Sequence, residues 1–182
     1  MPGGTVDVPT MHLTDQSFGY AESDGYRMLR LPYGEHGRYG MEILLPDESS
    51  SLPKMLGSLD EAGWRATTGR LTKQRFEKVA LPRFELRWSG ELLPPLQKLG
   101  LPTAGLTRMS RLDPALTTVV HKTYIRVDEK GTEAAAVTGG VTAMSAVAGG
   151  TEFVVDRPFA FTISDTRTGA ILFLGAVADP RA

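Results

Sequence analysis

The sequence contains no cysteine and only three histidines, His12, His36 and His121. Without cysteine the chain has no disulfide bond, no thiolate nucleophile and no zinc site built on thiolates. The same absence leaves the redox compartment undetermined. Three scattered histidines give little support to a metal site, so we expect neither a bound metal nor a cofactor.

Long apolar runs and a surplus of charge are also missing. No stretch reaches the roughly 18 apolar residues of a membrane-spanning helix. The formal net charge is −1 and the basic residues are scattered singly, so we expect neither a membrane nor a nucleic acid as partner. The N-terminal stretch MPGGTVDVPTMHLTD lacks the basic region and the apolar core of a secretory signal.

Patterns typical of enzymes are absent as well. No serine lies in a G-x-S-x-G turn, and His36, beside Glu35 in a glycine-rich turn, is best explained as solvated. The stretches TGGVTA and AGGT have neither the spacing of a phosphate-binding loop nor a following Lys-Ser/Thr. The carboxylate pairs Asp47–Glu48 and Asp60–Glu61 fall in a turn and a helix, where solvent exposure explains them. We therefore do not expect an enzyme.

What remains is a strand-rich chain of 182 residues, typical of one globular domain or a piece of a larger one. The pattern of apolar and strand-forming residues predicts a hairpin over 6–20 and strands over 26–31, 39–45 and 117–127. It also predicts two strands or one interrupted strand around Pro82, and a final pair over 159–163 and 170–177. The last of these, AILFLGAV, is expected to be buried. Helices are predicted over 52–64 and 91–99, the second ending at Gly100. The inventory indicates an α+β fold with large, mainly antiparallel sheets and a few short helices.

The segment 131–150 is unusual because it is a long connection between strands, written in Gly, Ala, Thr and Val. Strand connections normally take roughly two to six residues. Every second residue from Thr132 is small and uncharged: Thr132, Ala134, Ala136 and Thr138. The opposite set, Glu133, Ala135, Val137 and Gly139, carries the only charge. If the segment became a strand, one side could be buried and the other would tolerate water. Periodicity alone leaves open the alternative of a flexible surface loop.

The flanks of this segment resemble a known family. VVHKTYIRVDEKGTEAAAVT is similar to the hinge region of the serpins, a family of protease inhibitors, and DRPFAFTISDTRTGAILFLGAVADP resembles the hairpin that ends the serpin domain. Upstream, RLPYGEHGRYGMEILLP and VALPRFELRWSGELLPPLQKLGL resemble other serpin segments in the same order. The resemblance covers nearly the whole chain. It implies one partial serpin domain over residues 1–182, the C-terminal half of the family's domain, with a long exposed reactive loop over 129–152.

The resemblance implies an inhibitor that is consumed in its reaction with a serine endopeptidase or, as a second class, a cysteine endopeptidase. In the family, the protease cleaves the loop and remains attached as an acyl-enzyme, while the N-terminal part of the loop enters a sheet as a new strand. The proximal hinge would be Glu129, Lys130 and Gly131, and Thr132 would be the first residue to enter the sheet. The whole hinge would comprise Glu129, Lys130, Gly131, Thr132, Glu133, Ala134, Ala135, Ala136, Val137 and Thr138.

The resemblance also points to the bond that the protease would cleave. Counting from Glu129 gives Ser145 followed by Ala146, and counting back from Pro158 gives Val147. The two counts differ by two residues, and Met144–Ser145 lies within that margin of the first. The candidate residues of the reactive bond are therefore Met144, Ser145 and Ala146. All are small or uncharged, which disfavours a trypsin-like target and favours elastase-, subtilisin- or chymotrypsin-like proteases.

The chain also departs from the family pattern. A serpin domain is about twice as long, so the N-terminal helices and several sheet strands would have to come from elsewhere, including the strand on the far side of the insertion gap. His121 corresponds to a family histidine under that gap. We expect a missing N-terminal half as a partner, or else a truncated, non-inhibitory module, and an open sheet edge brings a risk of polymerisation. The resemblance implies an extracellular protein.

Overall fold

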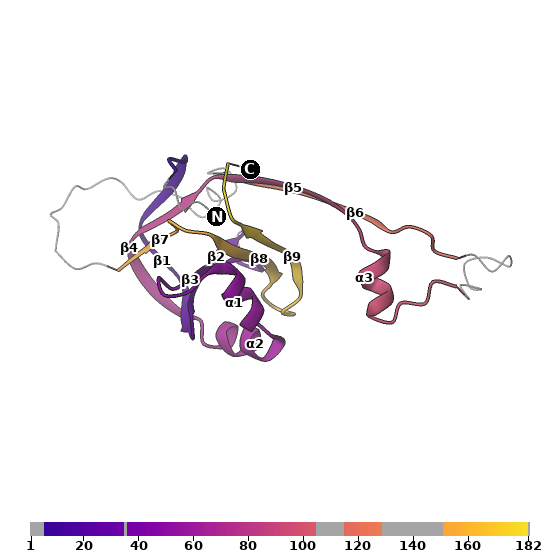
Figure 1. The fold of residues 1–182 in the computed structure, drawn as a ribbon. Coiled ribbons are helices and arrows are strands. Elements are labelled where there is room, and N and C mark those ends of the chain that lie inside the picture. Colours follow the sequence, from indigo (N-terminus) through magenta and orange to yellow (C-terminus); the bar gives the residue numbers. More distant parts are fainter. Residues whose placement is uncertain (1–5, 35, 105–114, 129–150, 182) are drawn as a thin grey trace. The chain divides into compact units, whose positions relative to one another are not determined.

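The computed structural model describes residues 6–34, 36–104, 115–128 and 151–181 (Figure 1). The chain divides into two compact units. The first comprises Met1–Phe84 and Val127–Ala182, and the second comprises Glu85–Arg126. The predicted α+β class is confirmed: a large sheet dominates the first unit, and the helices are few and short.

The first unit is built on a seven-stranded sheet with the order β7-β4-β1-β2-β3-β8-β9. Its strands are β1 (Thr10–Ser23), β2 (Tyr26–Tyr33), β3 (Tyr39–Pro46), β4 (Thr72–Pro82), β7 (Glu152–Val154), β8 (Phe159–Asp165) and β9 (Ile171–Val177). All neighbouring pairs are antiparallel except β4 and β7, which are parallel. The strands predicted over 26–31, 39–45 and 159–163 are confirmed as β2, β3 and β8, each slightly longer than expected.

The prediction of an N-terminal hairpin is wrong, because residues 10–23 form the single strand β1. Its pairing with β4 runs from Thr10 to Tyr20 and is interrupted only at Asp15, whose φ of 53° bends the strand without reversing it. The chain reverses further on, at Gly25, where φ is 83° and Ser23 pairs with Tyr26. The loose alternation of the sequence therefore reflects a bent strand with one long partner.

The predicted helix over 52–64 is two helices, α1 (Leu52–Ser58) and α2 (Glu61–Gly69). The Asp60 carboxylate accepts a hydrogen bond of 2.7 Å from the Gly63 amide and caps the second helix, while Ser51 caps the first. Apolar side chains of these helices pack on one face of β2, β3 and β8. This core comprises Tyr26, Met28, Leu44, Leu52, Met55 and Ala160, with Leu59, Trp64 and Leu71 at its margin.

The other face of the sheet is aromatic at the β8–β9 end. The ring of Phe84 lies 5.6 Å from that of Phe159 and 5.2 Å from that of Phe161, and all three side chains are buried. Gly175 on β9 lies beneath the Phe161 ring, because a Cβ atom there would come within 2.5 Å of two ring carbons. β9 itself is the edge of the sheet. The expectation that it is buried is wrong for residues 171–174, which are exposed, and correct for Val177.

The second unit is a two-stranded sheet of β5 (Phe84–Glu91) and β6 (Val120–Val127) with the helix α3 (Leu93–Lys98) between them. β4 ends at Pro82 and β5 begins at Phe84, so two separate strands flank this point, as one of the two predicted alternatives had it. The strand predicted over 117–127 begins three residues later, at Val120. The helix α3 ends as predicted, because Gly100 has a φ of 88°, a conformation that glycine adopts readily.

Candidate functional site

The candidate site is the connection between β6 and β7. The predicted hinge residues, from Glu129 to Thr138, and the predicted reactive-bond residues Met144, Ser145 and Ala146 lie outside the described residues. What the structure describes is how each end of this connection is held: β6 and Asp128 on the N-terminal side, and Thr151 with β7 on the C-terminal side.

The C-terminal end is anchored firmly, although β7 has only three residues. The Glu77 amide donates to the Thr151 carbonyl at 3.0 Å, and the Val155 amide donates to the Ala80 carbonyl at 2.9 Å. Between these bonds, Phe153 is completely buried. Its ring lies edge-on to those of Tyr20 and Phe76 at 6.4 and 6.3 Å. An aromatic anchor and a parallel ladder on β4 therefore fix the chain where the connection ends.

Tyr20, one of the three rings in this aromatic cluster, has a raised pKa. Burial, together with a hydrogen bond from its hydroxyl to Glu22 at 2.7 Å, raises the pKa of Tyr20 to about 12. Tyr20 is therefore neutral across the physiological range, and it contributes to the anchor as an apolar ring with a hydrogen-bonding hydroxyl.

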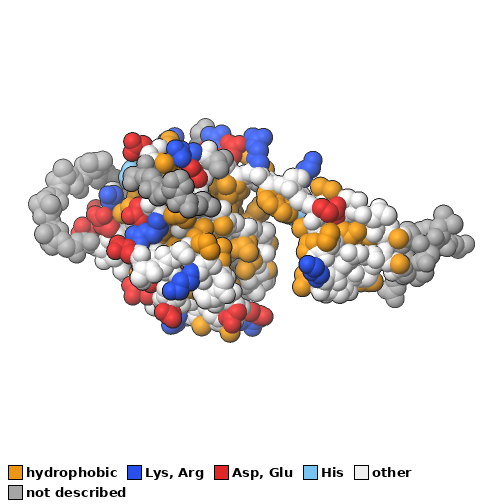
Figure 2. Space-filling model, viewed as in Figure 1, with side chains coloured by type: hydrophobic (Ala, Val, Ile, Leu, Met, Phe, Trp, Pro, Cys, Tyr) orange, Lys and Arg blue, Asp and Glu red, His pale blue; other side chains and the backbone are white. Residues whose placement is uncertain are grey.

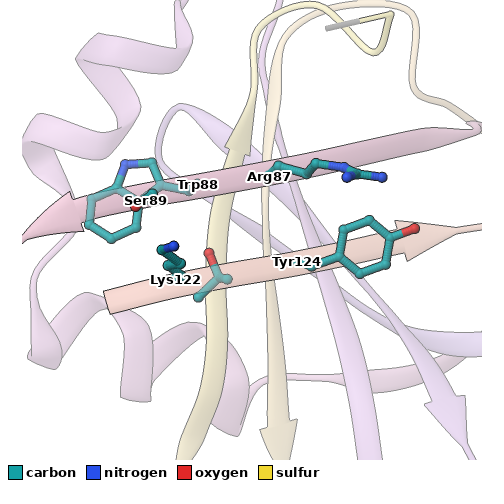
Figure 3. A pocket seen from close by; sticks show the side chains of 6 residues that line it. Arg87, Trp88, Ser89, Lys122 and Tyr124 are labelled. Atoms are coloured by element: carbon teal, nitrogen blue, oxygen red, sulfur yellow. The ribbon is translucent and has the colours of Figure 1, made fainter. Parts of the chain in front are cut away.

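The N-terminal end continues from β6, whose only partner among the described strands is β5. The side chains of this pair are largely exposed, and an open pocket of about 560 Å³ lies along it (Figure 3). Figure 3 shows Arg87 and Tyr124 extending from the neighbouring strands toward the same side, where the guanidinium carbon lies 5.1 Å from the ring centroid. Arg87 also donates two hydrogen bonds to Glu85, which lowers the pKa of that carboxyl and raises that of the guanidinium.

His121, the residue predicted to lie under an insertion gap, is on β6 and is exposed. Its ring lies 5.9 Å from that of Trp88 on β5. Trp88 in turn covers Gly90, where a Cβ atom would come within 2.4 Å of the indole. The structure thus brings His121 together with an aromatic ring of the neighbouring strand.

A polar cluster that sequence reasoning missed lies in the middle of the large sheet. Glu42 on β3 is completely buried and accepts hydrogen bonds from Arg30 at 2.7 Å, Thr162 at 2.6 Å and Ser164 at 2.8 Å. The cluster ties β2, β3 and β8 together through side chains. Its signal was in the sequence: Glu42 is an ionisable residue inside the apolar run GMEILLP, and such a residue needs partners when it is buried.

Other kinds of site find no support in the part of the chain that the structure describes. Within those residues, no group of three or more His, Asp or Glu side chains is placed to hold a metal ion. None of the described helices is long and apolar enough to cross a membrane.

Comparison with known proteins identifies the family. The profile of the family described as Serpin (serine protease inhibitor) matches residues 2–180. The chain belongs to the serpin family. It is 38% identical to a serpin-like protein of Thermococcus kodakarensis over 190 residues, 99% of this chain and 43% of that protein. It is 38% identical to the leukocyte elastase inhibitor of Bos taurus over 174 residues, 90% of this chain and 46% of the relative.

A third serpin relative is serine proteinase inhibitor 2 of Variola virus, 34% identical over 188 residues, which are 98% of this chain and 54% of the viral protein. The chain therefore spans about half the length of the curated relatives that it matches. The resemblance read from the hinge and the C-terminal hairpin is confirmed at the level of the family.

Proposed function

We propose that this chain is the loop-bearing part of a serpin-type inhibitor of a serine endopeptidase, with cysteine endopeptidases as the second target class. The reactive loop 129–152 would present the cleavable bond, at or next to Ser145, and after cleavage its hinge would enter a sheet as an added strand. The observation that carries the proposal is the serpin match over residues 2–180 together with the small-residue periodicity of that segment.

The way in which the two ends of the β6–β7 connection are attached to the sheets supports this proposal. Phe153 and the β4–β7 ladder fix the C-terminal end, while β6 on the N-terminal side has a single described neighbour. A cleaved loop whose far end stays fixed can move only from its hinge side, and a strand with one described neighbour offers an edge for pairing.

The residues at the proposed reactive bond indicate the class of target protease. Met144, Ser145 and Ala146 carry no charge, which fits the small or apolar specificity pockets of elastase-, subtilisin- and chymotrypsin-like proteases. The name of the bovine relative, leukocyte elastase inhibitor, agrees with the first of these. An extracellular site of action would agree with such targets.

Insertion can be tested with a matched pair of variants in the hinge. Ala134→Arg would place a charge on the side predicted to be buried, and Ala135→Arg would place it on the side predicted to face water. Burying an unpaired charge is costly, so we expect Ala134→Arg to be cleaved as an ordinary substrate and Ala135→Arg to keep forming an SDS-resistant complex with elastase or subtilisin. Equal behaviour of the two variants would contradict strand insertion.

The position of the reactive bond can be tested separately. Ser145→Arg should move the reaction from elastase toward trypsin, because the trypsin specificity pocket holds an acidic residue. Unchanged rates against both proteases would contradict this placement, and cleavage products analysed by mass spectrometry would show which bond is used.

A second candidate function is a non-inhibitory binding module. In this alternative the matched region, about half the length of its relatives, would bind a partner without strand insertion. Cleavage between residues 142 and 147 without a stable adduct, in every combination of chain and protease, would support this candidate.

A further inference from the structure

One residue of the large sheet has an unusual backbone conformation. Asp15, in the middle of β1, has a φ of 53°, in the left-handed region that favours glycine. Every other residue with such a φ in the described part of the chain is a glycine: Gly25, Gly34, Gly37, Gly100 and Gly169. A glycine would bend β1 at a lower energetic cost. The presence of aspartate at this bend therefore indicates that its side chain has a use.

The fold itself makes little use of that side chain. The Asp15 carboxylate accepts one hydrogen bond, through Oδ1, from Nη2 of Arg75 at 3.0 Å. The two side chains are 69% and 72% exposed, so this ion pair contributes little to stability. Among the described residues Oδ2 has no partner, and neither oxygen caps a backbone amide. The carboxylate can therefore accept a hydrogen bond from a donor on another molecule.

Asp15 lies close to the point where the β6–β7 connection ends. The register of β1 against β4 places Asp15 opposite Glu77. The Glu77 amide in turn donates to the Thr151 carbonyl, at the end of the connection. Because neighbouring strands are about 4.8 Å apart, two strand spacings place the backbone of Asp15 about 10 Å from Thr151.

The length of the connection limits where a bound protease can lie. Thr151 comes six positions after Ser145, and a chain of that length spans at most about 20 Å. A protease domain of about 240 residues has a radius of gyration of roughly 18 Å. A protease seated on the proposed reactive bond is therefore large enough and close enough to cover the surface around Asp15.

The surface around Asp15 carries charges of both signs. Figure 2 shows acidic and basic side chains intermingled at the end of the first unit where Figure 1 labels β1, β4 and β7. The charged residues here are Lys73, Glu77, the pair Asp15–Arg75 and the pair Lys78–Glu152, whose charged atoms are 3.9 Å apart. These cations and anions balance, so the surface has no net charge that would attract polyions in general. Recognition at this surface depends on where single charges lie.

We propose that Asp15, oriented by Arg75, is a second contact for the target protease outside the reactive loop. It accepts a hydrogen bond from a lysine or arginine beside the active-site cleft of the protease. This inference rests on the proposed function, because it takes the connection to be the segment that the protease cleaves. An exposed charge of this kind accelerates association and makes it depend on salt. The partner is thus an endopeptidase that combines a small or apolar specificity pocket with a basic surface next to it.

The test compares two exposed acidic residues. Asp15→Asn removes the charge, and asparagine tolerates the left-handed conformation, so the fold should be kept. Glu61→Gln is the matched control, because Glu61 is also exposed and paired with an arginine, Arg65, but lies on α2, outside this surface. Elastase and subtilisin are the probes, and the measurement is the second-order rate constant for cleavage of the loop in the full chain at low salt. We expect Asp15→Asn to lower this rate constant by about tenfold for at least one protease, and Glu61→Gln to leave it unchanged.

Salt and a second variant separate the charge from the backbone. In about 1 M salt, where charges are screened beyond roughly 3 Å, the parent chain and Asp15→Asn should react at the same rate. Asp15→Gly also removes the charge but relieves the positive φ, and it should lose as much rate as Asp15→Asn. A loss with Asp15→Gly alone, or a loss that persists at high salt, would assign the effect to the shape of β1 and would overturn the proposal.

Equal rate constants for Asp15→Asn and the parent chain with both proteases would also overturn it. The proposed function has a different readout, the SDS-resistant complex. Cleavage that depends on Asp15 but leaves no stable complex would uphold this inference and contradict inhibition. Stable complexes that form at rates independent of Asp15 would do the reverse, and a chain that neither protease cleaves or binds would contradict both.

Discussion

Glu42 illustrates how much a single residue can decide within the large sheet. It lies completely buried in the middle of β3, and its two carboxylate oxygens accept from three side chains on two neighbouring strands. Burying a carboxylate is tolerable only when it is paired and hydrogen-bonded. The cluster satisfies this condition, and it also excludes other registers of β8 against β3, because a shift by one residue would turn Thr162 and Ser164 away.

The ion pair within this cluster is asymmetric, which gives a prediction at the residue scale. The Arg30 side chain is 25% exposed and that of Glu42 is fully buried. Removing Glu42 leaves a cation that water can reach, whereas removing Arg30 leaves a buried anion. We expect Arg30→Met to lower the free energy of unfolding by about 3 kcal/mol and Glu42→Met to lower it by less. Urea denaturation of both variants measures this difference.

The double variant Arg30→Met/Glu42→Met is the control for this asymmetry. Replacing a buried pair by apolar side chains is often nearly neutral, so the double variant should be more stable than Arg30→Met alone. A double variant as unstable as the sum of the two single variants would show that the two side chains act independently.

At the scale of elements, β9 combines a buried and an exposed half. Its C-terminal half is fixed to β8: Val177 is buried, and Gly175 lets the Phe161 ring lie over the backbone and contact Phe84. Its N-terminal half, residues 171–174, carries the exposed apolar side chains. The strand is therefore held in register by glycine and aromatic packing, independently of whatever covers its outer surface.

Gly175→Ala tests this packing. The added methyl group would lie about 2.5 Å from two carbons of the buried Phe161 ring, so the ring or the strand must shift. We expect a loss of roughly 1–3 kcal/mol in the free energy of unfolding, as for other overpacked sites. Gly57→Ala is the matched control, because Gly57 lies in α1 with nothing within 4 Å of the added Cβ. Alanine favours a helix over glycine, so that variant should be neutral or slightly more stable.

At the scale of the whole molecule, the pKa values of three carboxyl groups are lowered, each by its own arginine partner. A hydrogen bond from Arg157 lowers the pKa of Asp156, and hydrogen bonds from Arg181 lower that of Asp179 to about 2. The pKa of Asp165 is also lowered: burial opposes the shift, but the Arg167 amide and the Arg38 guanidinium outweigh it.

These shifts predict how stability depends on pH. A carboxyl whose pKa is lower in the folded than in the unfolded chain stabilises the fold fully above its unfolded value of about 3.8, and this contribution is lost as pH falls through the folded value. The free energy of unfolding should therefore be level near neutral pH and decline from about pH 4 toward pH 2. Asp165→Asn should show a shallower decline in denaturation series at several pH values. An identical slope would show that Asp165 contributes nothing to acid sensitivity.

The sequence by itself determined those structural features that depend on residues close together in the chain. The short apolar runs in YRMLRLPY and in YGMEILLP predict β2 and β3, because such runs bounded by turn-forming glycines are typical of buried strands. Gly100 marked the end of α3, since glycine readily adopts the positive φ found there. The hinge and the C-terminal hairpin were specific enough to identify the family, which the match over residues 2–180 confirms.

Only the tertiary structure determined those features that depend on contacts between residues far apart in the chain. The stretch 6–20 alternates loosely, as a hairpin would, yet its residues 10–20 lie in one bent strand, because β4, some sixty residues away in sequence, pairs with them along most of their length. Ser164 bonds to Glu42 across 122 positions, a pairing that no local pattern specifies. The strand AILFLGAV has the composition of a buried strand, but burial requires a neighbour, and β9 is the last strand of the described sheet. Amino-acid composition determines which surfaces are apolar, and the order of strands in the sheet determines which of these surfaces are buried.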